Sequence, residues 1–221
     1  MQWLSLQPTL EPLVGDVPEL LGTALALSDV ANYESYLIDE EVTEHAAMGA
    51  MRKLSFSSGR RCVRAAQDAI ALARFPVGRA GKEPIWPSGC VGSISHSSSV
   101  AVAVVSKSLA GIGVDIESAN RVTEKIWPSV FTENEQTWLS RAPSFCVDVM
   151  FSAKEAGYKA IFPRGRKFIG FHEAEIHLDL SRQQFRIVYL GKHGPNKLLD
   201  SGIGYWHRAF CLLYTSDAAD E

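Results

Sequence analysis

The segment Gly111-Ile-Gly-Val-Asp-Ile-Glu117 is the clearest strand in this sequence. Its three branched apolar residues alternate onto one face, whereas Gly113, Asp115 and Glu117 lie on the other. Such a period of two is typical of a β-strand. The carboxylates of Asp115 and Glu117 therefore point the same way, and Gly113 leaves room beside them for something to approach the backbone.

The sequence on either side of this strand mixes helical and extended patterns. Apolar residues recur at spacings of three and four within residues 39–75, and a second helix is predicted over about 147–162, ended by Pro163. Thr132-x-x-Glu135 has the capping-box pattern that opens a helix. Further strands are predicted at 91–94, 100–105, 176–180, 185–190 and 203–210. Because helices and strands do not alternate strictly, the pattern favours an α+β fold.

The composition is that of an ordinary globular protein. Of the 221 residues, 46% are hydrophobic and 21% are charged, whereas a disordered chain has fewer apolar residues and a larger net charge. The formal net charge of −3 argues against a nucleic-acid-binding protein. No apolar run reaches the roughly 18 residues of a membrane-spanning helix, and the N-terminus lacks a secretory signal pattern. The four cysteines show no C-x-x-C spacing, so we expect a reduced, cytoplasmic protein.

The stretch from Cys211 to Glu221 breaks the pattern of the strand that precedes it. Its residues are small, acidic and unpatterned, and they resemble the translation of an adapter used in sequencing libraries. We therefore expect residues 211–221 to be a structureless, non-native tail, with a natural flexible tail as the alternative. Without its three acids, 25 − 3 = 22 acids balance the 22 bases of the chain.

A third carboxylate, Glu155, lies on the second predicted helix, with Lys159 one turn further on. Three hard oxygen ligands, Asp115, Glu117 and Glu155, suit Mg²⁺, which completes its octahedron with water and substrate phosphates. The alternative is an exposed Asp-x-Glu edge and a surface Glu–Lys pair. The apolar neighbours of both motifs and the space beside Gly113 favour the metal site.

Basic residues indicate what such a metal would hold. Arg52, Arg60 and Arg64 lie on the first predicted helix, where no acid occurs between residues 52 and 67. Arg79 and Lys82 follow in a loop rich in Gly and Pro. Arginine is preferred where phosphate is bound bidentately, whereas solvated helix charge is the alternative for each residue alone.

His96 follows a run of small residues, where its imidazole would be able to bind a phosphate. A structural histidine that caps the loop is the alternative. Several other segments do not match the catalytic or binding motifs that they resemble. Residues 78–82 lack the first glycine and the final Ser or Thr of a P-loop, His172 and His177 are too far apart for a zinc-protease helix, and no G-x-S-x-G occurs.

Two of these motifs together resemble a known family. Gly113-Val-Asp-Ile-Glu117, followed by Phe151-Ser-Ala-Lys-Glu-Ala-Gly-Tyr-Lys159, is similar to the signature of the 4′-phosphopantetheinyl transferases. Upstream, residues 57–66, 83–87 and 92–96 resemble the enterobactin-synthase-type branch, which modifies carrier proteins of siderophore, peptide and polyketide synthesis. The resemblance extends from about Arg52 to Phe171.

The resemblance implies a fold of two similar α/β halves related by a pseudo-twofold axis, with coenzyme A in the cleft between them. Residues 1–110 would form the half that binds the coenzyme A phosphates, and residues 111–210 the half with the metal and the catalytic groups. Residues 211–221 would lie outside this fold.

The resemblance also implies roles for individual residues. Asp115, Glu117 and Glu155 would hold Mg²⁺ against the pyrophosphate, and Glu155 and Lys159 would be catalytic. Ile169 falls where a backbone lines the pantetheine arm, and Arg79 and Lys82 lie in a loop that carries a basic contact. The remaining positions expected to contact coenzyme A are Arg52, Arg60, Ser95, His96 and Lys159.

The expected reaction transfers the 4′-phosphopantetheine arm of coenzyme A to a serine of an apo acyl, peptidyl or aryl carrier protein and releases 3′,5′-ADP. Glu155 would accept the proton of the serine. We expect a monomer that has no nucleic-acid partner and no membrane-spanning segment. The alternative is a Mg²⁺-dependent hydrolase of coenzyme A or a related nucleotide diphosphate, which would use the same carboxylates with water as the nucleophile. A non-catalytic coenzyme A-binding protein would lack the metal carboxylates.

Overall fold

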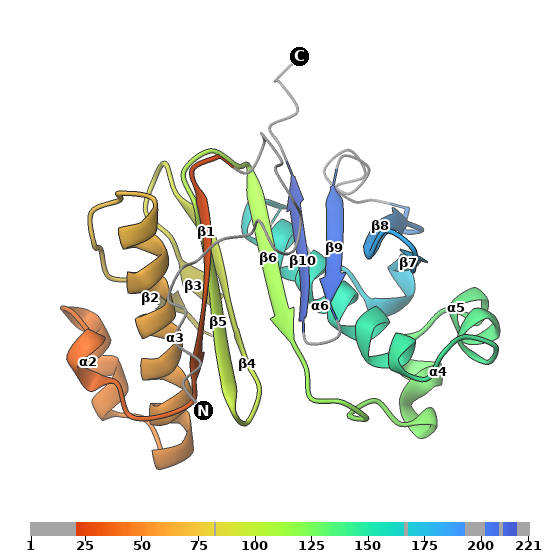
Figure 1. Ribbon diagram of the computed structural model, residues 1–221, viewed down its shortest axis with the longest axis horizontal. Coiled ribbons are helices and arrows are strands. Elements are labelled where there is room, and N and C mark those ends of the chain that lie inside the picture. The colour runs from red at the N-terminus through yellow and green to blue at the C-terminus, as the bar shows by residue number, and fades with distance from the viewer. Residues whose placement is uncertain (1–20, 82, 166–167, 193–201, 208–209, 216–221) are drawn as a thin grey trace. The chain divides into compact units, whose positions relative to one another are not determined.

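The structure is a computed structural model that describes residues 21–81, 83–165, 168–192, 202–207 and 210–215. The chain divides into two compact units, Met1–Leu109 and Ala110–Glu221 (Figure 1). Both units combine helices with antiparallel sheet, in agreement with the predicted α+β class. In the described part of the chain, none of the helices is both long and apolar enough to cross a membrane.

The first unit is a three-stranded sheet packed against one long helix. Strands β1 (Thr23–Asp29), β5 (Val100–Ser106) and β4 (Val91–His96) pair antiparallel in that order. Buried alanines of β1 and β5 meet Cys62, Val63 and Ala66 of α3 (Ala50–Ala69) in the core of this unit. The small side chains let the helix pack closely on the sheet. The other elements are η2 (Glu34–Tyr36), α2 (Glu40–Ala46), β2 (Gly78–Ala80) and β3 (Glu83–Ile85).

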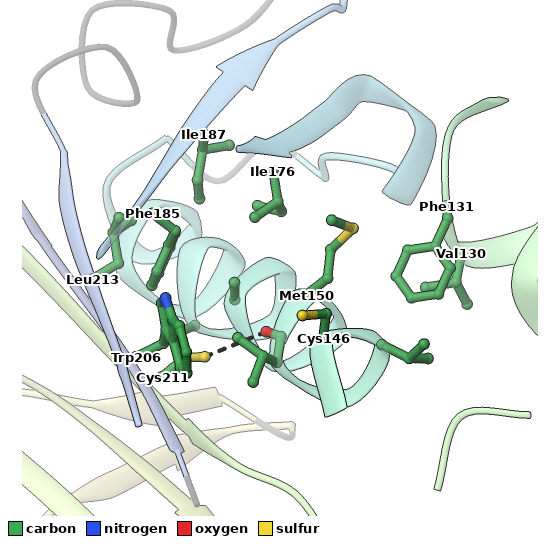
Figure 2. Packing of buried hydrophobic residues seen from close by; sticks show 14 of the residues in the cluster. Val130, Phe131, Cys146, Met150, Ile176, Phe185, Ile187, Trp206, Cys211 and Leu213 are labelled. Carbon is green, nitrogen blue, oxygen red and sulfur yellow. Dashed lines mark hydrogen bonds between the residues drawn. The ribbon is translucent and has the colours of Figure 1, made fainter. Parts of the chain in front are cut away.

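The second unit is a five-stranded antiparallel sheet in the order β6-β10-β9-β8-β7. Helix α6 (Phe145–Gly165) packs against it, and Figure 2 shows Met150, Phe185, Ile187 and Leu213 in the core that they share. The strands are β6 (Gly111–Ile116), β7 (Ala174–Asp179), β8 (Gln184–Tyr189), β9 (Ile203–His207) and β10 (Phe210–Thr215). Short helical segments complete the unit: η3 (Glu124–Ile126), α4 (Trp127–Val130), α5 (Glu133–Leu139) and η4 (Phe171–Glu173).

Two details of the helices test the sequence patterns. The capping box at the start of α5 is confirmed, because Thr132 Oγ1 accepts the Glu135 N–H and Glu135 Oε2 accepts the Thr132 N–H. The second predicted helix was expected to end at Pro163. This is wrong, because the helix, α6, continues to Gly165. A proline this close to a helix end removes only one backbone hydrogen bond within the helix.

The expectation that the chain is structureless from Cys211 onward is wrong for residues 211–215. These residues belong to β10, which pairs with β6 on one side and β9 on the other, in the register Cys211↔Asp115 and Leu213↔Gly113. Cys211 and Leu213 are fully buried, and the Cys211 thiol donates to the Val149 carbonyl of α6 (Figure 2). The partners of this strand are remote in sequence, so a local pattern did not reveal it. Residues 216–221 lie outside the described residues.

Leu213→Ala should destabilise the protein by about 2–5 kcal/mol, because the substitution removes a fully buried side chain from the core against α6. The control is Ile203→Ala on the adjacent strand β9, where the side chain is 42% exposed and a change within about 0.5 kcal/mol is expected. Urea denaturation measures both values. An equally small loss for both variants would show that β10 is not part of the folded core.

Candidate functional site

The predicted carboxylates are placed by a close contact between β6 and α6. A Cβ added to Gly113 would lie 1.9 Å from the Ala156 carbonyl oxygen and 2.7 Å from the Ala160 nitrogen. The space beside Gly113 is therefore filled by the backbone of α6. Glu155 and Lys159 immediately precede the two alanines, so this contact brings them to the strand face that carries Asp115.

Lys159 and Asp115 form a short ion pair at this contact. The Lys159 Nζ lies 2.6 Å from Asp115 Oδ1 and also donates to the Val114 carbonyl at 3.3 Å. The Asp115 side chain is almost fully buried, whereas that of Lys159 is about one quarter exposed. The pair is therefore formed at the edge of the core, where the ammonium group keeps access to solvent.

Glu117 and Glu155 complete a group of three carboxylates. Burial raises the pKa of Glu155 above its usual range; Lys159 opposes this shift, and Asp115 and Glu117 add to it. Burial and the charge of Asp115 likewise raise the pKa of Glu117, whose Oε2 lies 2.7 Å from Arg121 Nη1. The four residues predicted for this part of the site are thus within electrostatic range of one another. Arg121 was missed, although its spacing of four from Glu117 was visible.

The chemistry of these donors fits a hard cation. Among the described residues, no three His, Cys, Asp or Glu side chains form a ready-made metal site. Mg²⁺ does not require one, because it binds through one or two carboxylates and completes its octahedron with water and substrate phosphates. Asp115, Glu117 and Glu155 supply oxygen ligands only, which suits this ion better than a softer metal.

A pocket of about 220 Å³ lies next to Glu155 in the second unit. Its wall includes Ile169, the residue expected beside the pantetheine arm. Apart from Lys154 and Glu155, it is lined by apolar side chains, Tyr158 and glycine: Gly157, Tyr158, Ile161, Phe168, Ile169, Gly170, Phe171, Ala174 and Ile187. A mostly apolar pocket lined by a few charged groups is typical of a small-molecule site.

Lys154 holds one wall of this pocket in place and was missed by the sequence analysis. Its Nζ lies 2.8 Å from Glu135 Oε2 and donates to the carbonyls of Phe171 and Ala174, at 2.7 and 2.5 Å. Both side chains of the ion pair are almost completely buried. Burial lowers the pKa of Lys154, and the hydrogen bond to Glu135 opposes that shift. Its position beside Glu155 in the quoted motif was the available signal.

Gly113→Ala should destabilise the protein by at least about 1–3 kcal/mol, because a methyl group cannot fit against the backbone of α6 without moving the helix. The shift would also separate Lys159 from Asp115, so activity should fall more than the loss of folded protein explains. The control is Gly49→Ala, whose added methyl group meets no atom within 4 Å. Thermal unfolding and specific activity of the folded fraction measure the two effects. A Gly113→Ala protein as stable and active as Gly49→Ala would contradict the close contact.

The first unit gathers the predicted phosphate-binding residues. Arg52 Nη1 donates to His96 Nε2 at 3.1 Å, and His96 Nδ1 lies 3.3 Å from the Ser97 carbonyl. Burial lowers the pKa of Arg52, and the charge of Arg79 lowers it further. Arg52, Arg79 and His96 therefore lie close together, with Ser95 buried next to His96 on β4. Lys82 lies outside the described residues.

Arg60 belongs to the same electrostatic group but is buried. Burial lowers its pKa to about 10; Glu41 opposes that shift, and Arg64 and Arg79 add to it. Its Nε lies 2.9 Å from Glu41 Oε1, and its Nη2 donates to the Val77 carbonyl at 2.7 Å. The alternative of solvated helix charge does not hold for this residue.

The same is true of the neighbouring arginines of α3. Arg64 is 1% exposed and binds both oxygens of Glu41, at 2.7 and 2.6 Å. Arg61 is 6% exposed and donates to the hydroxyl of Ser28 at 2.9 Å. The arginines of α3 lie in an acid-free stretch of the sequence and therefore bind polar groups of other elements, such as Ser28 of β1 and Glu41 of α2.

Family models match both units of the chain. The model of the 4′-phosphopantetheinyl transferase N-terminal domain matches residues 39–106, and that of the 4′-phosphopantetheinyl transferase superfamily matches residues 111–210. The chain is 30% identical to 4′-phosphopantetheinyl transferase Svp of Streptomyces mobaraensis, over 91% of this chain and 87% of the relative. It is 29% identical to 4′-phosphopantetheinyl transferase PptT of Mycobacterium tuberculosis, over 74% of this chain and 78% of the relative.

A third relative is enterobactin synthase component D of Salmonella typhi, which is 30% identical over 58% of this chain and 56% of its own length. The family predicted from the two motifs is thus confirmed by models that match both units of the chain and by a relative aligned along most of it. The chain belongs to the 4′-phosphopantetheinyl transferase superfamily and is an enzyme of the branch that includes enterobactin synthase component D.

Proposed function

We propose that this enzyme transfers the 4′-phosphopantetheine arm of coenzyme A to a serine of an apo carrier protein, in a Mg²⁺-dependent reaction that releases 3′,5′-ADP. The observation that carries the proposal is the group formed by Asp115, Glu117, Glu155 and Lys159 where β6 meets α6. Its carboxylates offer oxygen ligands for a metal ion, and the ammonium group of Lys159 offers a positive charge for phosphoryl oxygens. Glu155 also offers a base.

The substrate matches the charges and the apolar surface that the protein offers. The phosphates of coenzyme A would bind Arg52, Arg60, Arg79 and His96, with Ser95 next to His96. The contact expected from Lys82 stays a prediction. The pantetheine arm would occupy the apolar pocket that contains Ile169 and reaches Glu155. The carrier would be an acyl, peptidyl or aryl carrier protein, as the family resemblance implies. The pseudo-twofold relation of the halves, the monomeric state and the cytoplasmic location stay predictions.

Asp115, Glu117 and Glu155 would hold Mg²⁺, which, when bound, would offset the charge of the diphosphate. A carboxylate oxygen of Glu155 accepts the proton of the carrier serine, and the serine oxygen forms a bond to the β-phosphorus. The bond from that phosphorus to the bridging oxygen breaks, and 3′,5′-ADP leaves with that oxygen. The ammonium group of Lys159, oriented by Asp115, stabilises charge on the phosphoryl oxygens.

Mass spectrometry of apo carrier proteins incubated with the enzyme, coenzyme A and Mg²⁺ tests the proposal. We expect about 340 Da, the mass of a phosphopantetheine arm, on a single serine, with 3′,5′-ADP released in equal amount. Chelation of Mg²⁺ should abolish the transfer. Release of phosphopantetheine without any carrier would instead support the hydrolase. An unmodified carrier together with intact coenzyme A would overturn the proposal.

A further inference from the structure

Glu41 is a fully buried carboxylate that the proposed reaction does not use. It lies on α2, and its two oxygens are surrounded by donors. Oε1 is 2.9 Å from Arg60 Nε, accepts from Arg64 Nη2 at 2.7 Å and accepts the Val77 N–H at 2.8 Å. Oε2 accepts from Arg64 Nη2 at 2.6 Å and from the Ile38 N–H at 3.2 Å. One carboxylate thus joins α2, α3 and the chain before β2.

These contacts hold the Arg60 guanidinium in one orientation. Glu41 Oε1 forms an ion pair with the guanidinium, 2.9 Å from its Nε, and Nη2 donates to the Val77 carbonyl at 2.7 Å. The group also stacks over the Phe56 ring, 4.4 Å from the ring centre. Within the described part of the chain, the hydrogen bond to Val77 uses one of the five N–H donors of the guanidinium, and the contact with Glu41 is an ion pair. Arg60 is therefore held before a ligand arrives, which reduces the entropy that binding costs.

The same carboxylate also holds the segment that carries Arg79. Val77 is bound at both polar atoms of its backbone, because its N–H donates to Glu41 and its carbonyl accepts from Arg60. Strand β2 begins at the next residue, and Arg79 is its second residue. Arg79 lies near enough to Arg60 for its charge to lower the pKa of Arg60.

We propose that Glu41 is a positioning residue for the anionic end of coenzyme A: it sets Arg60 directly and Arg79 through Val77, without touching the substrate. The inference rests on the proposed function, in which these arginines bind phosphate. The direction in which coenzyme A affinity changes when Glu41 is removed distinguishes this role from a purely electrostatic one. If Glu41 acted only through its charge, it would weaken the attraction for an anion, and its removal would tighten binding. If it positions the arginines, its removal weakens binding.

The test uses Glu41→Gln in the full chain, with the affinities of coenzyme A and 3′-dephospho-coenzyme A measured by calorimetry without a carrier protein. We expect coenzyme A to bind about tenfold more weakly, equivalent to about 1.4 kcal/mol, and 3′-dephospho-coenzyme A to change much less. The control is Asp29→Asn. It removes the carboxylate of β1 that lies 3.4 Å from Arg61, the neighbour of Arg60 on α3, and it should leave both affinities within about twofold.

A second measurement separates positioning from a general loss of structure. In an Arg60→Met background, Glu41→Gln should weaken coenzyme A binding much less than in the wild type, because only the route through Val77 to Arg79 remains. Should Glu41→Gln fail to fold, Glu41→Asp keeps the charge, shortens the side chain and should show the same selective loss. Unchanged or tighter coenzyme A binding by Glu41→Gln, or losses that simply add in the double variant, would overturn the inference.

The two proposals fail in different ways. A wild-type protein that binds coenzyme A but transfers nothing contradicts the proposed function, while the effect of Glu41→Gln on affinity still decides the role of Glu41. A wild-type protein that modifies its carrier while Glu41→Gln keeps full affinity contradicts the positioning role alone. A wild-type protein that does not bind coenzyme A contradicts both.

Discussion

Glu155→Gln should lower kcat for carrier modification about 10²–10⁴-fold, the usual contribution of a general base, while the affinity for coenzyme A changes far less. Glutamine keeps the size of the side chain and one oxygen able to bind a metal, but it cannot accept the serine proton. The position of Glu155 supports this, because it lines the apolar pocket and lies within electrostatic range of Asp115 and Lys159. Initial rates at saturating coenzyme A and carrier measure the effect.

A matched substitution and a metal titration make this test specific. Glu133→Gln changes an exposed carboxylate in the same unit and should leave kcat within about twofold. Asp115→Asn should weaken Mg²⁺ binding, so that excess Mg²⁺ partly restores its activity. If excess Mg²⁺ restored Glu155→Gln to the same degree, Glu155 would be only a metal ligand, and the base would have to be found elsewhere.

Lys154→Met should destabilise the protein by about 3–5 kcal/mol, because it leaves the Glu135 carboxylate buried without its partner. It also removes the donor to the carbonyls of Phe171 and Ala174, so the wall of the pocket next to Glu155 loses its support. Urea denaturation of the single variants and of Lys154→Met/Glu135→Gln measures the coupling. The double variant should recover part of the loss, since the buried charge is then gone.

The control for Lys154 is an ion pair at the surface. Arg74→Met removes a partner of Asp68 in a pair whose two side chains are about half exposed, and it should cost no more than about 1 kcal/mol. A Lys154→Met protein as stable as Arg74→Met would show that the buried pair contributes little. The comparison therefore tests burial, not ion pairing in general.

Much of the fold follows from local patterns. The alternation in residues 111–117 and the capping box before α5 each reflect contacts within a few residues, and the structure contains both. The same is true of the strands predicted near residues 91, 100, 176 and 185. The helical pattern over residues 39–75 was correct in type but hid a break, because α2 ends at Ala46 and α3 begins at Ala50. It also extended too far, because α3 ends at Ala69.

The candidate site was predictable to the extent that its chemistry is written in short motifs. Spacing alone indicated that Asp115 and Glu117 share a strand face and that Glu155 and Lys159 share a helix. The distance of 2.6 Å between Lys159 and Asp115, which are 44 residues apart in the sequence, results from the packing of α6 against β6. Gly113 had been interpreted as space for an approaching group, and only the packing identified that group as α6.

By itself the sequence determined the class of fold, the central strand, the long helices and the residue types of a phosphate-transfer site. The tertiary structure alone decided which charges are paired: Arg60 and Arg64 with Glu41, and Lys154 with Glu135. It alone also made residues 210–215 a strand of the sheet. The physical reason is the same in each case. Periodicity records which side of an element faces the core, whereas a buried charge or a strand edge is satisfied by a group brought from a distant part of the chain, and no local pattern encodes that group.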